Sequence, residues 1–166
     1  AKVERIGRRN NGIFTYKNPV CNGERHLEKV DIPTYTEGIQ LFLDCMLSDD
    51  ETIGALSDIS KIEKVGFKTV LAPGYSVHVI DEQVEARMRE FLDVAPAHNG
   101  PYLEAVSHFR KLLPDAVLVG AFETAFHETI PLERKIYAVP YEWYEKYGVR
   151  RLGYHGASHG YIASCL

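Results

Sequence analysis

The stretch Ala116-Val117-Leu118-Val119-Gly120-Ala121-Phe122 is apolar throughout, and it decides the fold class. Pro114-Asp115 precede it and a charged residue, Glu123, follows it, so its length suits a buried strand. Helical patterns stand before and after this strand along the chain. Strands that alternate with helices in this way predict an α/β fold with helices packed on a sheet.

Four helices are expected from capping residues and from apolar residues repeated at helical spacing. Thr36, Asp81 and Ser158 are suitable N-caps for three of them. Pro101 is expected to open the fourth, because proline has no N–H to lose at a helix start. A second strand is expected over Val65 to Leu71.

The first part of the chain predicts an antiparallel meander with strands at roughly 3–7, 13–16 and 27–32. Asn11-Gly12 and Asn22-Gly23 are the signals, because both residue types tolerate the positive φ angles of a type I′ turn. Together with the later strands this predicts a mixed sheet flanked by helices. No linker or repeat interrupts residues 1–166, so a single domain is expected.

The composition narrows the choice of partners. The chain has 166 residues, 45% of them hydrophobic, and a formal net charge of -4, which offers no basic surface for nucleic acid or an anionic membrane. Cys21, Cys45 and Cys165 are odd in number and far apart, which favours a reducing cytoplasm over a disulfide framework. The chain starts directly in strand-like sequence and stops within a helical pattern, as expected of a fragment.

Glu123 is the first candidate for chemistry. In α/β sheets, ligands bind beyond the carboxyl ends of strands, and Glu123 is the first residue after the apolar strand, with His127 close behind. The alternative is that Glu123 only caps or pairs locally.

Histidines at two expected helix starts form the second candidate. His98 precedes the helix at Pro101 and His155 precedes the helix at Ser158, where free N–H groups favour an anion. His155 and His159 also have the spacing of an HxxxH zinc site, although no glutamate follows the first histidine. A purely structural role for each histidine is the third alternative.

Several stretches closely resemble the acetate kinase (acetokinase) family, over essentially the whole chain. They include FETAFHETIP at 122–131, GYHGASHGYI at 153–162, APAHNGPYLEAV at 95–106, VGFKTV at 65–70 and VERIG at 3–7. The resemblance implies the acetate and sugar kinase, Hsp70 and actin (ribonuclease H-like) fold. The chain would then be the incomplete N-terminal half of an acetokinase.

The resemblance also implies an activity. In the family, ATP and acetate give ADP and acetyl phosphate by direct in-line phosphoryl transfer, with Mg²⁺. His98 and His155 match the family's phosphoryl-contacting histidines, and His159 matches a companion in the same motif. Glu123 and Lys68 match catalytic positions, of which Glu123 is also the expected Mg²⁺ ligand.

The acyl substrate is expected to be small. Val70, Ala97 and Tyr154 match positions that line the pocket for the acetate methyl in the family. Ala97 stands where the family has a larger apolar residue, so a propionate- or butyrate-like specificity is an alternative.

Other departures from the family pattern concern charge. Glu123 replaces an aspartate, Lys68 replaces an arginine, and a His-Gly-Gly element is absent after Lys68. Lysine keeps the positive charge and loses the bidentate fork of arginine. The family's ATP-binding half has no counterpart here, so the isolated chain is expected to be inactive.

Two other functions remain open at this stage. The chain could be a non-catalytic relic that still binds small anions through His98 and His155. It could also be an oligomerising domain, in which an exposed sheet edge pairs with another chain, for example as a homo-oligomer.

Overall fold

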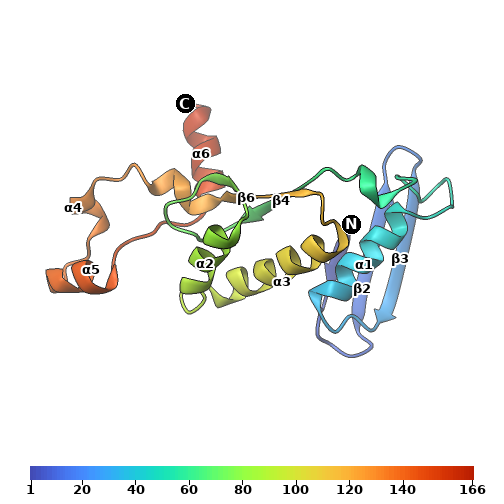
Figure 1. Cartoon of the computed structure of the whole chain (residues 1–166), viewed down its shortest axis with the longest axis horizontal. Helices are drawn as coiled ribbons and strands as arrows, with labels where there is room; N and C mark the ends of the chain where they lie inside the picture. Colours follow the sequence, from blue (N-terminus) through green and yellow to red (C-terminus); the bar gives the residue numbers. More distant parts are fainter. The chain divides into compact units, whose positions relative to one another are not determined.

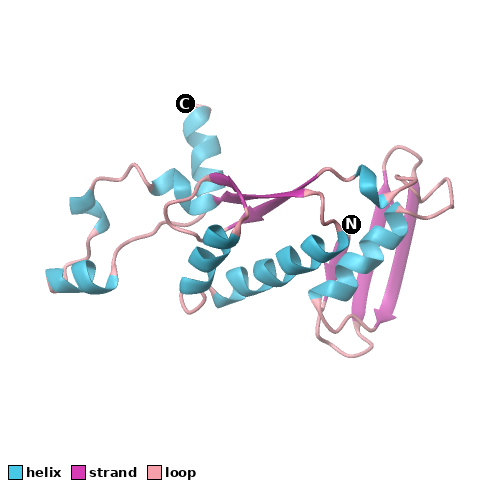
Figure 2. Ribbon diagram, in the orientation of Figure 1, coloured by secondary structure: helices cyan, strands magenta, loops and turns pink.

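The computed structural model describes all 166 residues, which divide into two compact units. The first unit comprises Ala1–Val65 and Leu103–Val117, and the second comprises Gly66–Tyr102 and Leu118–Leu166. Figures 1 and 2 show the helices and strands of each unit. No helix is long and apolar enough to cross a membrane.

The first unit contains a three-stranded antiparallel sheet in the order β1-β2-β3 and helix α1. The strands are β1 (Lys2–Glu4), β2 (Gly12–Asn18) and β3 (Gly23–Val30), and the helix is α1 (Tyr35–Met46). A short 3-10 helix, η1 (Ile59–Lys61), follows. The predicted antiparallel meander is therefore confirmed.

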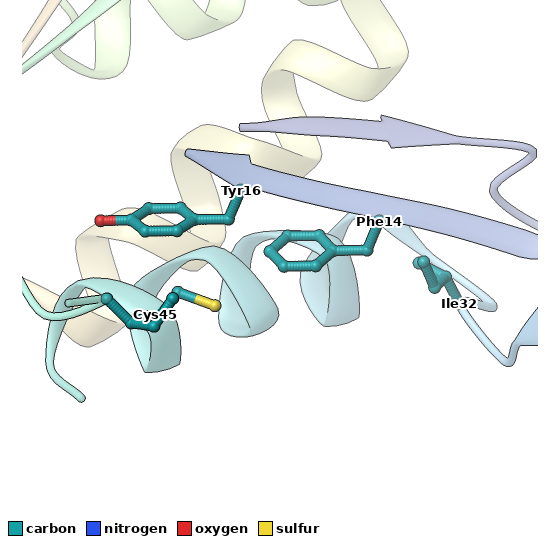
Figure 3. Close-up of a cluster of buried hydrophobic side chains, with 5 residues drawn as sticks. Phe14, Tyr16, Ile32 and Cys45 are labelled. Atoms are coloured by element: carbon teal, nitrogen blue, oxygen red, sulfur yellow. The ribbon is translucent and has the colours of Figure 1, made fainter. Parts of the chain in front are cut away.

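The core of this unit lies between β2 and α1. Alternate residues of β2 are buried, so Phe14 and Tyr16 point to the same face, where they meet Ile32, Cys45 and Ile53 (Figure 3). Cys45 belongs to α1, whose packed side carries the apolar repeat seen in the sequence.

The turns of the meander differ from the prediction. Gly12 and Gly23 begin strands β2 and β3, and neither has a positive φ angle, so the predicted type I′ turns are wrong. The left-handed residues are Arg5, Gly7 and Asn10 before β2, with φ of 61°, 80° and 49°, and Asn22 before β3, with φ of 56°. Asparagine tolerates this conformation, and the connections are longer than two-residue turns.

The second sheet has the order β4-β6-β5, with β4 at Lys64–Thr69, β5 at Val77–Val79 and β6 at Val117–Phe122. Strands β5 and β6 are antiparallel, with Val77 opposite Ala121. The apolar stretch 116–122 forms the predicted strand, β6, but only its alternate residues Leu118, Gly120 and Phe122 are buried, so the strand is half-buried. The second predicted strand is β4. A mixed α/β architecture is therefore confirmed.

The helices that follow these strands are α2 (Glu82–Glu90), α3 (Pro96–Leu112), η2 (Glu123–His127), α4 (Leu132–Lys135), α5 (Tyr141–Tyr147) and α6 (Gly156–Ser164). Asp81 caps α2 as predicted, because its carboxylate accepts a hydrogen bond of 2.9 Å from the Val84 N–H.

Three predicted helix starts are wrong. The N-cap of α1 is Thr34, which forms a capping box with Glu37. Helix α3 begins at Pro96, where proline fits the first position, and Pro101 lies inside the helix. Helix α6 begins at Gly156 with His155 at the N-cap, so Ser158 lies within the helix.

Candidate functional site

Glu123 lies at the end of β6, where the apolar strand stops and η2 begins. Its side chain is only 8% exposed, and it forms an ion pair with Lys68 of the neighbouring strand β4, whose side chain is 68% exposed. The pair places a buried carboxylate beside an accessible ammonium group at one end of the second sheet.

The ion pair also fixes the charge of Lys68. Its pKa lies above the ordinary value because its ammonium donates a hydrogen bond to Glu123, and the attraction of the carboxylate charge adds to this. A raised lysine pKa means that the pair is complete at neutral pH and is lost only as the pH rises through that value.

A groove of about 250 Å³ lies next to this pair. Its walls are mainly apolar and come from Val77, the end of β6, η2 and the first turn of α6. Lys68 and Glu123 supply its charged groups, and Gly156 and Ala157 supply helix backbone. An apolar groove with a few fixed polar groups is typical of a small-molecule site.

Helix α6 begins in an unusual backbone turn. His155 is its N-cap in the left-handed region, with φ 55°, and Gly153 has φ 78°. No side chain caps the helix, and a helix N-terminus favours an anion because its first N–H groups have no partner within the helix. The exposed imidazole of His155 stands at this end of the helix.

His127 supports this turn. Its Nε2 lies 2.8 Å from the Tyr154 carbonyl oxygen. Because a carbonyl only accepts hydrogen bonds, Nε2 carries the proton. The imidazole also occupies the space where a side chain at Gly153 would be. His127 thus holds the two residues that precede His155, although nothing in the local sequence links positions 127 and 154.

His159 lies one turn into α6 and packs against η2. Its ring stacks on Phe126, with centroids 6.5 Å apart, and meets His127 edge-to-face at 5.7 Å. The contacts make His159 part of the packing between α6 and η2.

His98 and Ala97 are exposed in the first turn of α3, and the buried residue Asn99 anchors that turn. The Asn99 side-chain amide donates hydrogen bonds of 2.9 Å to the carbonyl oxygens of Leu71 and Met88. The first turn of α3 is therefore tied to the segment after β4 and to α2.

A small apolar cluster connects the two histidine-bearing turns. Val70, Leu71 and Ala95 are its buried members, and Leu152 packs against them. His98 follows Ala95 by one helical turn, and His155 follows Leu152 by three residues. Val70 also accepts a hydrogen bond of 3.4 Å from the N–H of Thr124, beside Glu123. The predicted site residues thus all belong to the second unit.

Comparison with known proteins identifies the family to which this arrangement belongs. The model of the acetokinase family matches residues 1–166. The chain belongs to the acetokinase family. Acetate kinase of Halothermothrix orenii is 38% identical over 163 residues, which are 97% of this chain and 40% of that enzyme.

Solved structures agree with the family assignment. The chain matches the crystal structure of Porphyromonas gingivalis acetate kinase with a TM-score of 0.83 and 32% identity, over 98% of this chain and 40% of that one. A propionate kinase from Francisella tularensis, at 24% identity and a TM-score of 0.82, shares the fold. The family and the fold class expected from the sequence are confirmed, and the acetokinase chain spans about 40% of these relatives' length.

The acetokinase chain has a limited set of groups for a metal ion. No group of three histidine, cysteine, aspartate or glutamate side chains gathers anywhere in residues 1–166. Mg²⁺ is often held by one or two carboxylates together with substrate phosphates and water, and Glu123 could supply one such carboxylate. To bind Mg²⁺, the Glu123 carboxylate would have to leave Lys68 or contact the metal ion and Lys68 at the same time.

We expect Lys68→Met to destabilise the acetokinase chain by about 1–2 kcal/mol, because it leaves the buried Glu123 carboxylate without its partner. Urea denaturation at pH 7 measures the change. Lys64→Met on the same strand is the matched control, because Lys64 is exposed and forms no comparable ion pair. Equal stability of the two variants would contradict the importance of the pair.

Two substitutions of His127 distinguish the contribution of its hydrogen bond to stability from the contribution of its ring packing. His127→Phe keeps a ring beneath Gly153 and loses the donor to Tyr154, so we expect a loss of about 1 kcal/mol in stability. His127→Gln keeps an N–H donor and should recover part of this loss. Denaturation curves and the backbone NMR signal of His155 report both effects. A glutamine variant no better than phenylalanine would show that the hydrogen bond is unimportant.

Proposed function

We propose that this chain forms the acyl- and phosphoryl-binding part of an acetokinase. The proposed reaction is transfer of the γ-phosphoryl group of ATP to acetate, which gives ADP and acetyl phosphate. The Lys68–Glu123 pair beside the uncapped start of α6 carries the proposal, because one groove combines an accessible cation with a helix N-terminus, which favours an anion.

The chemistry of the acceptor suits these residues. A carboxylate is already ionised and needs no general base, so catalysis depends on bringing two anions together and stabilising the charge of the transferring group. Lys68 and His155 are donors for that charge, and His98 contributes a second imidazole. Positioned donors of this kind act without reorganising during the reaction.

ATP and Mg²⁺ are the cofactors that the family implies. Mg²⁺ would neutralise phosphate charge when bound, and Glu123 is the residue that we assign to it. His159 keeps α6 against η2, which holds the first turn of α6, with Gly156 and Ala157, at the groove. The free cysteines and the family assignment support a cytoplasmic location.

Turnover is a property that we assign to the whole acetokinase. Because this chain spans 40% of the Halothermothrix orenii enzyme, we expect no turnover from the 166 residues alone. The test uses a joined protein, in which this chain replaces the segment of that enzyme that it matches. Acetyl phosphate formation from acetate and Mg-ATP by the joined protein supports the proposal. A folded joined protein without turnover would contradict it.

Val70, Ala97 and Tyr154 are proposed to surround the acyl group. Ala97 is exposed and small, so we expect room for a longer acid such as propionate or butyrate. In the joined protein, Ala97→Leu should lower the ratio of kcat/KM for propionate over acetate about tenfold, because one or two methylenes in a pocket discriminate by this amount. An unchanged ratio would show that Ala97 does not contact the acyl group.

A second candidate function is anion binding without catalysis. The ion pair favours it, because Glu123 already engages Lys68, which lacks the planar bidentate fork of an arginine. In that case the free chain binds acetyl phosphate, and the joined protein binds it equally well without turning over.

A further inference from the structure

The end of β6 has a polar residue on each side of it. Lys68 of β4 forms its ion pair with Glu123, which directly follows β6. On the other side β5 is antiparallel to β6, so Ser76, the residue just before β5, lies beside the last residue of β6. The Ser76 carbonyl oxygen accepts a hydrogen bond of 2.8 Å from the Phe122 N–H. Lys68 and Ser76 therefore flank the same end of the central strand of the second sheet.

The groove at this end of the sheet has few polar side chains. Ten residues line it, and only Lys68, Ser76 and Glu123 among them have polar side chains. The other lining residues, such as Val77 and Phe126, have no polar side-chain atom. The groove has a volume of about 250 Å³, which is smaller than most sites for drug-sized ligands. An anionic group of a small molecule in this groove has to be bound by these three side chains and by backbone.

The charges of the groove nearly cancel. The Lys68 side chain is 68% exposed and the Glu123 side chain is 8% exposed, so an anion can reach the ammonium group. Because Glu123 already pairs with this ammonium group, the net charge of the pair is zero and attracts an anion only weakly from a distance. A lysine is also a compact point charge, which does not fix the orientation of a carboxylate or phosphate group as a planar fork does. A second directional donor is therefore needed.

The Ser76 hydroxyl can supply this donor. Ser76 is exposed, and its hydroxyl has no hydrogen-bond partner within the protein. The backbone around it is held in place, since the ring of Tyr75 lies 6.3 Å from that of Phe122 and 5.1 Å from that of His78. A hydroxyl can rotate to donate to a ligand oxygen while its residue stays fixed. The Ser76 side chain thus lines the groove without a contribution to the fold.

We propose that Ser76 is a substrate-binding residue, which donates its hydroxyl to one oxygen of an anionic group while Lys68 binds another oxygen of the same group. The carboxylate of the acyl substrate and the transferring phosphoryl group share this chemistry. Val77 and Phe126 then contact the apolar part of the bound molecule. The identity of the anion rests on the proposed function, whereas the role of the Ser76 hydroxyl can fail by itself.

NMR titration of the free chain tests the role of Ser76 without a measurement of activity. The probes are sodium acetate and, in a separate titration, inorganic phosphate, with sodium chloride at equal ionic strength as the reference. The backbone N–H signals of Gly156 and Ala157 report on the groove, because both residues line it. Ser76→Ala should raise the Kd at least about tenfold, because a hydrogen bond to a charged group is among the stronger kinds. An effect on acetate alone identifies the carboxylate as the partner, and an effect on phosphate alone identifies the phosphoryl group.

Two further variants separate binding from structure. Ser76→Thr keeps a hydroxyl and should bind both anions as the unaltered chain does. Ser107→Ala is the matched control, because Ser107 is an exposed serine of α3 in the first unit. We expect this variant to bind normally. Ser76→Ala should keep the Tm of the unaltered chain, since its hydroxyl has no partner to lose.

Three results would overturn the role of Ser76 and leave the proposed function in place. The first is an unchanged Kd of Ser76→Ala for both anions. The second is a Ser76→Thr variant that binds as weakly as Ser76→Ala. The third is a large fall in the Tm of Ser76→Ala, which would make the hydroxyl structural. If the unaltered chain bound neither anion, both the role of Ser76 and the anion site of the proposed function would be wrong.

Discussion

Replacement of His155 by alanine in the joined protein is expected to lower kcat for acetyl phosphate formation about 10²–10³-fold, the usual effect of losing one positioned donor to a developing charge. His155 is the N-cap of α6, directly before the N–H groups that border the groove. Its imidazole is exposed, so the substitution removes a donor and little packing. Initial rates at saturating Mg-ATP and acetate measure the effect.

His26→Ala is the matched control for this prediction. His26 is an exposed histidine on β3 in the first unit, where it contacts Thr15 and Glu28. We expect this variant to keep the rate of the unaltered joined protein. If His155→Ala were as active as His26→Ala, His155 would have no part in the transfer.

Gly156→Ala is expected to cause the largest loss of stability. A Cβ at this position would collide with the Glu123 carbonyl oxygen and lie 2.9 Å from the Phe126 Cβ. The obstructing atoms are mainly backbone, so α6 must move away from η2. Overpacking of this severity costs about 3 kcal/mol, and a corresponding fall of roughly 6–12 °C in Tm is expected.

Gly100→Ala is the control for the glycine prediction. Gly100 lies within α3, and an added Cβ there would meet nothing within 4 Å. Alanine is the better helix former, so we expect this variant to gain about 0.5–1 kcal/mol. If α6 packs on η2 as described, calorimetry should show a lower Tm for Gly156→Ala and a higher Tm for Gly100→Ala than for the unaltered chain. A tolerated Gly156→Ala would contradict that packing.

The elements with strong periodic patterns could be predicted from the sequence. Residues 116–122 are apolar without a break, and they form β6 almost to the residue, which leaves Glu123 at the carboxyl end of the strand. Asp81 lies before a clear amphipathic repeat and caps α2. For both β6 and the start of α2, the preference of the local sequence agrees with the tertiary structure.

The helix starts near the candidate site could not be predicted in this way. Capping preferences favour Ser158 over His155, yet His155 adopts a left-handed conformation that few non-glycine residues take. Two prolines compete for the start of α3, and Pro96 takes that position. Contacts between distant residues decide these cases, including the hydrogen bonds of His127 to Tyr154 and of Asn99 to Leu71.

The Lys68–Glu123 pair illustrates the same limit. The two residues are far apart in the sequence, and they meet because β4 and β6 are neighbours in the second sheet. The resemblance to acetokinases names both positions as catalytic but does not say that they pair with each other. Burial of one carboxylate and exposure of its lysine is a consequence of tertiary packing alone.

The binding of acetyl phosphate to the free chain is the most direct test of the account. Carbon–proton NMR can follow the ring signals of all seven histidines during a titration, with sodium chloride at equal ionic strength as the control. We predict that the signals of His98 and His155 shift along one saturable curve while His26 does not respond. Shifts that are absent, or that appear equally at His26 and in sodium chloride, would contradict a phosphoryl-binding site at these two helix starts.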